Sequence, residues 1–417
     1  MKGDDSEMLD KLLKRIESYR DDMIKLQTEI TAIPALSPEN GGDGEHEKAE
    51  YIKKVLEGFG FSGIKMYHAP DERCKTKARP SLVAKVPGRS SDKTFWVMSH
   101  TDIVPPGELS MWNSDPYKVV VKDGKLIGRG VEDNQQGLVS SVFALKAFMD
   151  EKITPEYDLG LLIVADEETG SQYGLGYLSK NHPELFGKND IIVVPDGGNP
   201  DGTMVEIAEK SIMWMKVRTT GKQCHGSRPE CGNNAHKANA YLTVKFDNLY
   251  KDFPARDELF DPPISTFEPT KKDANVPNIN TIPGDDVFYM DCRVMPCYDL
   301  KKEIIAKMRS YADEVEKQFG VKVEFSYPQI EQAAPATSGD SPVVKLICAA
   351  VREIYKKEPK LEGIGGGTVA AFFRRAGIPC VVWSKLDESC HQPNEYCYIA
   401  NMIGDAQVFA HMIVNMK

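Results

Sequence analysis

The sequence lacks the features that define several classes of protein. No apolar run approaches the ~20 residues that a bilayer-spanning helix needs, and no internal repeat or low-complexity tract is present. Basic residues are outnumbered: 52 Lys and Arg stand against 62 Asp and Glu, for a formal net charge of -10. This balance argues against nucleic acid or an anionic membrane surface as the main partner. Residues 1–22 are charged throughout and lack the apolar core of a signal peptide, so we expect a cytoplasmic protein.

Paired cysteine motifs are also missing. The chain has nine cysteines, an odd number, and no two of them have the C-x-x-C spacing of a zinc ribbon or a redox site. Several lie in apolar surroundings, so we interpret most of them as reduced core residues. Cys224 and Cys390 each precede a histidine, and for both we favour packing over a role as a soft metal ligand.

Four short apolar runs of strand length are present in a chain that is too long for one ordinary core. They cover residues 94–100, 159–166, 191–196 and 380–384, and helical patterns separate them. Continuous apolar strands of this kind are typical of a parallel or mixed sheet with both faces covered. The sequence therefore predicts an α/β fold with a mixed sheet flanked by helices.

The middle of the chain has a different pattern. Residues 212–327 alternate between strand-like and helix-like segments in the order β-α-β-α-β, a ferredoxin-like α+β composition. We predict that this stretch is a smaller domain inserted into the larger one, whose two parts are 1–211 and 328–417.

Polar side chains follow the predicted strands at the point where each strand ends. In open α/β sheets, sites lie just outside the carboxyl ends of the strands, so we expect these side chains to converge on one crevice. The candidates are His100 with Asp102, Glu132 with Asp133, the acidic run Asp166–Glu168, Asp196, and His391.

Each candidate also has an ordinary explanation when it is taken alone. His100 could belong to a turn, Asp133 could cap the helix that follows it, and the Asp166–Glu168 run could be a solvated acidic loop. Asp196 fits a plain turn, and a single loop histidine such as His391 is usually no ligand.

Together the candidates supply two histidines and several carboxylates. Such a mixed set suits Zn²⁺, with Co²⁺ or Mn²⁺ as alternatives. It is also large enough for two metal ions that share a bridging carboxylate at a separation of ~3.5–4 Å. A pair of dications would offset the cost of placing adjacent acids at the end of a buried strand.

The ordered set of motifs resembles one family over nearly the whole chain. It is similar to the dinuclear zinc amidohydrolases and peptidases that include acetylornithine deacetylase, succinyl-diaminopimelate desuccinylase, carboxypeptidase G and the aminoacylases. The motifs that carry the resemblance are SHTDIVPPGE, GRGVEDNQQG, DEETGS, PDGG, CHGSRPECGNNA and CHQPNE.

The resemblance implies a role for each polar strand exit. His100 and Asp196 would hold one metal, Glu168 and His391 would hold the other, and Asp133 would bridge the two. Asp102 would orient His100. Glu167 would be the general base that takes a proton from the metal-activated water and then gives it to the leaving amine. The family also has a cis peptide after the bridging aspartate, here between Asp133 and Asn134.

The resemblance further implies a role for the inserted domain as a lid and dimerisation domain. His225 would reach the active site of the partner subunit in a homodimer and help to bind the oxyanion. Lys210, Asn280, Arg293 and Thr368 occupy positions where relatives bind substrate, although each could also be an ordinary surface residue.

Two departures from the family pattern affect the substrate pocket. Ala370 occupies a position where the family often has Asp, and NQQG follows Asp133 where many relatives have Met-Lys-Gly. We therefore predict an amide hydrolase for a small N-acyl amino acid, with a dipeptidase or carboxypeptidase as the alternative. A catalytically silent metal-binding or peptide-binding protein is the third hypothesis, and the presence of Glu167 argues against it.

Overall fold

The computed structural model describes residues 3–417, which divide into two compact units. The first unit comprises the residues up to Ile207 together with Thr337–Leu361 and Phe372–Lys417. The second comprises Ala208–Ala336 and Glu362–Ala371. Within the described residues, no helix is long and apolar enough to cross a membrane.

An eight-stranded mixed sheet, in the order β1-β2-β6-β3-β7-β16-β8-β15, forms the centre of the first unit and confirms the predicted fold class. Strand β3 runs parallel to both β6 and β7, and β7 runs parallel to β16, whereas β1 and β2 pair antiparallel. The strands are β1 (Ser62–Pro70), β2 (Ala78–Val86), β3 (Ser90–His100), β6 (Tyr157–Val164), β7 (Ile191–Gly198), β8 (Met204–Glu209), β15 (Lys360–Ile364) and β16 (Cys380–Ser384). A small separate sheet contains β4 (Val120–Lys122), β5 (Lys125–Ile127) and β17 (Tyr396–Tyr398).

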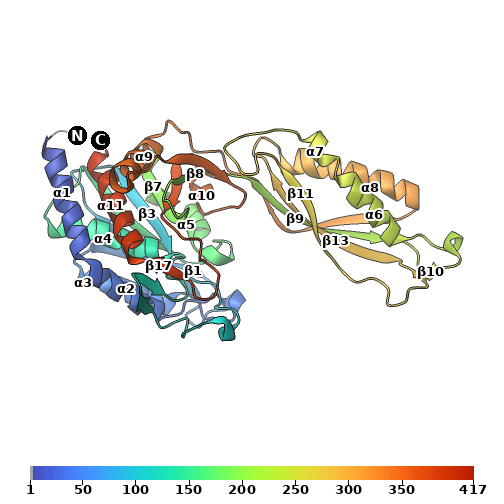
Figure 1. The fold of residues 1–417 in the computed structure, drawn as a ribbon, viewed down its shortest axis with the longest axis horizontal. Helices are drawn as coiled ribbons and strands as arrows, with labels where there is room; N and C mark the ends of the chain where they lie inside the picture. The colour runs from blue at the N-terminus through green and yellow to red at the C-terminus, as the bar shows by residue number, and fades with distance from the viewer. Residues whose placement is uncertain (1–2) are drawn as a thin grey trace. The chain divides into compact units, whose positions relative to one another are not determined.

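Helices flank this sheet because its central strands are apolar and need cover on both faces. Figure 1 shows α4 and α11 side by side next to β3, and α4 is buried along nearly its whole length. The helices are α1 (Gly3–Ser18), α2 (Arg20–Thr31), α3 (His46–Gly58), α4 (Gln135–Asp150), α5 (Leu175–Asn181), α9 (Pro342–Tyr355), α10 (Ala370–Arg375) and α11 (Ile399–Asn415). Short 3₁₀ turns are η1 (Pro38–Asn40), η2 (Leu109–Met111), η3 (Glu167–Thr169) and η4 (Pro183–Leu185).

Helix α11 contains a buried histidine that is not part of the polar strand exits. His411 is 6% exposed, and its Nδ1 has no hydrogen-bond partner among the described residues. Burial lowers the pKa of His411, while nearby Glu353 raises it and Lys356 lowers it. Burial therefore disfavours the charged imidazole in the folded protein.

We expect acidification to destabilise the protein through His411. Its pKa in the unfolded chain is about 6.5 and its pKa in the folded chain is lower, so the unfolded chain binds the extra proton first as the pH falls. This contribution to stability is present above about pH 6.5 and is lost below it. His411→Leu should flatten the dependence of the unfolding free energy on pH between about 7 and 5, measured by urea denaturation. His182, which is only partly buried, gives the control variant His182→Leu, and an unchanged slope in His411→Leu would contradict the assignment.

The second unit is an antiparallel sheet of four strands in the order β11-β13-β9-β14. Helices α6 and α8 pack together over one face of it (Figure 1). The elements are β9 (Ser211–Thr220), β10 (Cys224–His225), η5 (Pro229–Cys231), α6 (Ala235–Phe246), α7 (Leu249–Asp252), β11 (Thr266–Lys272), β12 (Thr281–Ile282), β13 (Asp285–Val294), η6 (Leu300–Ile305), α8 (Ala306–Phe319) and β14 (Lys322–Glu331).

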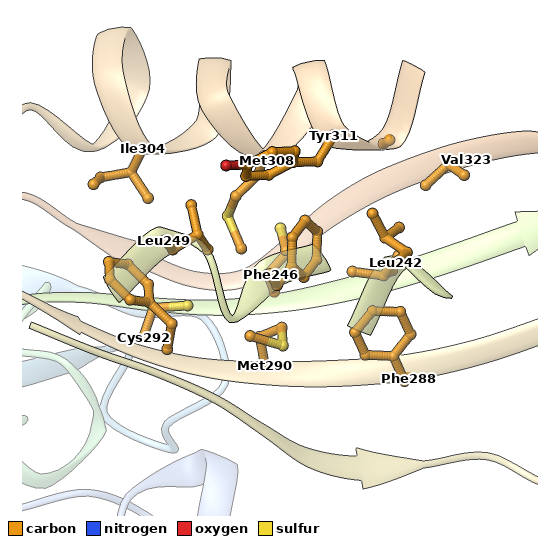
Figure 2. Close-up of a cluster of buried hydrophobic side chains, with 14 of the residues drawn as sticks. Leu242, Phe246, Leu249, Phe288, Met290, Cys292, Ile304, Met308, Tyr311 and Val323 are labelled. Carbon is orange, nitrogen blue, oxygen red and sulfur yellow. The ribbon is translucent and has the colours of Figure 1, made fainter. Parts of the chain in front are cut away.

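The core of this unit lies between the helices and the sheet. Figure 2 shows Phe246 and Leu242 of α6 pointing toward Phe288 of β13, with Met308 of α8 above them. All four side chains are at most 4% exposed. Alternate residues of β9 and β13 supply the sheet side of this core, as the alternating sequence pattern predicts.

The predicted α+β composition of the insert is confirmed, and its four-stranded sheet has one strand more than we expected. Strand β11 is the additional one. Its sequence, TFEPTKK, is mostly polar and contains Pro269, which is typical of an edge strand and weakens the strand signal. The Asp299 carboxylate caps the helical segment that begins at Leu300, because it accepts hydrogen bonds from the amides of Lys301 and Lys302.

Helices α1 and α2 are separated at Tyr19, whose hydroxyl donates to Asp150 of α4 at 2.6 Å. The interpretation of the cysteines differs in part from the structure. All nine cysteines are free, but only Cys74, Cys292, Cys380 and Cys397 are buried. The packing interpretation is wrong for Cys390, which is exposed.

Candidate metal centre

The first unit brings the five residues predicted as metal ligands to one place. They come from the end of β3, the loop before α4, the turn after β6, the last part of β7 and the loop after β16. Their ligand atoms form two groups in which all atoms lie within 4.8 Å of one another, namely His100, Asp133 and Asp196, and Asp133, Glu168 and His391.

Asp133 belongs to both groups, and each of its oxygens faces a different histidine. Its Oδ1 lies 3.0 Å from Nε2 of His100, and its Oδ2 lies 3.1 Å from Nε2 of His391. Asp196 approaches the first histidine, with its Oδ1 at 3.6 Å, and Glu168 approaches the second at 3.2 Å. The five side chains thus form two neighbouring groups of possible cation ligands that share one carboxylate.

Asp102 fixes the orientation of His100. The Nδ1 of His100 lies 3.0 Å from the carbonyl oxygen of Asp102 and 3.4 Å from its carboxylate, which leaves Nε2 directed at the acidic group. A carboxylate or carbonyl at one imidazole nitrogen holds the other in the form that binds a metal. Both side chains are fully buried, so this orientation is well fixed.

Asp102 also holds the turn that carries two of the acids. Its Oδ1 and Oδ2 accept hydrogen bonds from the backbone amides of Glu167 and Glu168, at 3.1 and 3.0 Å. One buried carboxylate thus positions a histidine of one group and the turn that supplies a glutamate to the other.

Burial and neighbouring charges raise the pKa of both glutamates on this turn. Burial, together with the charges of Asp196, Glu168 and Asp133, raises the pKa of Glu167 well above its usual value. Burial and the charge of Asp133 raise the pKa of Glu168 to about 7. Hydrogen bonds to Asp133 and Glu168 raise the pKa of His391 to about 10.

A second observation indicates that these side chains suit divalent cations. The Oε1 of Glu168 is buried and has no hydrogen-bond partner among the described residues. A buried carboxylate oxygen without a partner is costly, and a coordinated dication would satisfy it. Two imidazoles and three carboxylates are the ligands that zinc and related metals take in proteins.

Asn134 links two members of the first group, a function that the sequence reasoning missed. Its Oδ1 accepts the backbone amide of His100 at 3.1 Å, and its Nδ2 donates to the carboxylate of Asp196 at 3.0 Å. The peptide bond between Asp133 and Asn134 is cis, as the resemblance implied.

Asp166, for which the sequence offered no role, faces away from the ligand groups. Its Oδ1 accepts a hydrogen bond from Arg79 at 2.8 Å, and its Oδ2 accepts the amide of Tyr173 at 2.8 Å. Arg79 is fully buried and also pairs with the buried carboxylate of Glu45. The first acid of the run is therefore neutralised by an arginine from β2, a partner that no local sequence signal identifies.

The remaining predicted site residues lie in the second unit. His225 is exposed on β10, and its Nδ1 lies 2.8 Å from the hydroxyl of Ser227. Asn280 is exposed close to it, because its carbonyl accepts the amide of Gly226 at 2.6 Å.

Three other predicted residues are close to one another elsewhere in this unit and are already engaged. Lys210 donates to the carbonyls of Pro262 and Ile264, both at 2.7 Å. Arg293 pairs with Asp291 and donates to the carbonyl of Gly365. The backbone and hydroxyl of Thr368 bond to Glu209.

Sequence comparison places this geometry in a wider context. The profile described as peptidase family M20/M25/M40 matches residues 96–415. The chain is 42% identical over 419 residues to an uncharacterised metallohydrolase of Methanococcus maripaludis, covering 95% of this chain and 100% of that protein. It is 24% identical to succinyl-diaminopimelate desuccinylase of Polynucleobacter necessarius, covering 91% and 95%.

Solved structures share the fold at low sequence identity. An aminopeptidase from Bacillus cereus superimposes with a TM-score of 0.73 at 19% identity, covering 95% of this chain and 98% of the other. A dipeptidase from Saccharomyces cerevisiae gives 0.71 at 17% identity, covering 97% and 98%. A dinuclear metal-binding peptidase from Bacillus subtilis gives 0.66 at 15% identity, covering 95% and 98%.

Proposed function

We propose that this chain, which belongs to the M20/M25/M40 peptidase family, uses two divalent metal ions to hydrolyse the amide bond of a small N-acyl amino acid. The observation that carries the proposal is the position of Asp133, whose two oxygens face His100 and His391 at 3.0 and 3.1 Å. We take zinc as the native metal, with cobalt or manganese as alternatives.

Five residues would hold the metal ions. His100 and Asp196 would complete one site, Glu168 and His391 would complete the other, and Asp133 would bridge them. When bound, the ions would lower the pKa of a water molecule and polarise the carbonyl of the substrate. The protein keeps the ligands in place through Asp102 and Asn134.

Glu167 would move the proton. It belongs to neither ligand group, yet it lies on the turn that supplies Glu168, and its pKa is raised well above that of an ordinary carboxyl. A carboxyl with raised proton affinity can accept a proton from water and return it to a leaving amine. The backbone amide of Glu167, bonded to Asp102, fixes the turn from which the side chain extends.

The second unit would contribute substrate contacts in a cytoplasmic homodimer. His225 is exposed and has no ion-pair partner among the described residues. Its imidazole could therefore contact a substrate that is bound in the active site of the partner subunit. We assign Asn280 to the same surface because it lies beside His225. Lys210 and Arg293 would bind the substrate carboxylate, and Thr368 would contact the substrate, only if they exchange some of their present partners.

The alternative is a dipeptidase or carboxypeptidase with the same metal chemistry. The similarity of the fold to the yeast dipeptidase favours it. A panel of N-acetyl and N-succinyl amino acids against dipeptides, assayed with Zn²⁺, Co²⁺ and Mn²⁺, separates the two. We expect cleavage of N-acyl amino acids, and cleavage of dipeptides alone would establish the alternative.

Metal removal is expected to lower the thermal stability of the protein. A ligand that binds only the folded state stabilises it by about 4 kcal/mol at a thousand times its dissociation constant. Chelation should therefore lower Tm, and adding Zn²⁺ back should restore it in proportion to the logarithm of its concentration. His100→Ala is the matched control, because it should reduce the response to Zn²⁺. A Tm in the native chain that does not change with chelation would argue against tightly bound metal.

A further inference from the structure

Two buried glutamates outside both ligand groups connect the loops that carry Asp133 and His391. These loops are far apart in the sequence, since 258 residues separate the two ligands. Glu132 immediately precedes Asp133, and Glu395 follows His391 by four residues. Their side chains are 2% and 1% exposed, respectively.

Glu395 is bonded to the loop of Asp133. Its Oε2 accepts hydrogen bonds from Nη1 of Arg129 at 2.7 Å and from the amide of Gly130 at 2.9 Å. Its Oε1 accepts the amides of Glu132 at 2.9 Å and of Asp133 at 3.1 Å. A single carboxylate therefore fixes the backbone up to and including the bridging residue.

Glu132 makes the converse connection to the loop of His391. Its carboxylate accepts the backbone amides of Asp387 and Ser389, both at 2.5 Å, and lies 2.7 Å from the hydroxyl of Ser389. Ser389 is two residues before His391. Each loop thus contributes one glutamate whose carboxylate accepts hydrogen bonds from backbone amides of the other loop.

The conformation of the second loop requires such support. Glu388, His391 and Asn394 all have left-handed backbone conformations, with φ of 59°, 61° and 61°. Non-glycine residues adopt this conformation at a cost and keep it only where the surroundings impose it. Glu132 is bonded to residues that precede His391 in the sequence, and Glu395 follows His391.

We propose that Glu132 and Glu395 act as a reciprocal pair of positioning residues that set the distance between Asp133 and His391. The inference rests on the proposed function, because it concerns the site formed by Asp133, Glu168 and His391. The other site depends less on the pair, since His100 and Asp196 are held by Asp102 and Asn134. Loss of either glutamate should therefore weaken one metal site more than the other.

The test measures Co²⁺ binding to the variants Glu132→Gln and Glu395→Gln. Calorimetry gives the affinities and the number of ions bound, and visible absorption reports the environment of the bound ion. Glutamine keeps the volume but turns one acceptor oxygen into a donor that faces N–H groups. We expect the native chain to bind two ions, and each variant to bind the second about 10–100-fold more weakly with an altered spectrum. The double variant should be little worse than either single variant, because both remove the same constraint.

Asp190→Asn is the matched control. Asp190 is a buried carboxylate that accepts the amides of Thr94 and Gly187 and the indole N–H of Trp96, near the opposite end of β3 from His100. It should cost stability but leave both Co²⁺ affinities within about threefold of the native values.

Two results would overturn the inference in distinguishable ways. A native chain that binds no Co²⁺ rejects the proposed function and the inference with it. A native chain that binds two ions, with glutamine variants that bind both as tightly, rejects the inference alone. If a glutamine variant does not fold, Glu132→Asp and Glu395→Asp decide, because they keep the charge but shorten the reach. Unchanged binding of the second ion in these variants also rejects the inference.

Discussion

Glu167→Gln is expected to lower kcat by roughly 10²–10⁴-fold while both metal ions stay bound. The amide side chain cannot take a proton from water or return one to the leaving amine. The substitution should leave the turn intact, because Asp102 is bonded to the backbone of Glu167 and Glu168 and not to the glutamate side chain. The measurements are kcat on the best substrate of the panel and metal content by mass spectrometry.

The neighbouring acid provides the control. Glu168→Gln removes a residue of the second ligand group and should reduce the metal content as well as the activity. If Glu167→Gln hydrolyses amides as fast as the native chain, the assignment of the general base is wrong. If it loses metal as Glu168→Gln does, Glu167 is a ligand instead.

Arg79→Met is expected to destabilise the protein by about 3–5 kcal/mol, the usual cost of removing one partner from a buried ion pair. The guanidinium is fully buried between the carboxylates of Glu45 and Asp166, which would lose their counter-charge. The free energy of unfolding from urea denaturation gives the cost. Arg218→Met is the control, because its pair with Asp285 is exposed and should contribute about 0–1 kcal/mol.

The same variant tests what Asp166 does. If Arg79 serves to neutralise the two acids, then adding Glu45→Gln and Asp166→Asn to Arg79→Met should recover part of the lost stability. A cost for Arg79→Met no larger than that for Arg218→Met would contradict the picture of a buried ion pair.

The sequence predicted the four central strands of the large sheet and the polar residues at the strand exits, because both depend on local patterns. Apolar runs of strand length identified β3, β6, β7 and β16, and polar residues at or after their ends identified four of the five grouped side chains. Asp133 was identified instead from its position just before helix α4. Strand β11 was missed because an edge strand needs no apolar face and tolerates proline.

The supporting residues could not be predicted because their partners are distant in the sequence. Arg79 meets Asp166 across 87 residues, and Glu395 meets Asp133 across 262. No spacing rule links such pairs, and a buried arginine or glutamate looks like any other charged residue until the chain is folded. The motif CHQPNE contains Glu395, but nothing local indicates where its carboxylate points.

The wide spread of the ligand residues along the chain has a consequence for biosynthesis. His100, Asp133 and Asp196 are all made before the second unit, whereas His391 is made after it. During translation, a nascent chain can therefore gather the residues of one ligand group long before those of the other. The contacts that complete the second group have a large separation in sequence and form late, as such contacts do in folding. Binding of the second ion would then require that β16 and the loop that carries His391 have already joined the sheet.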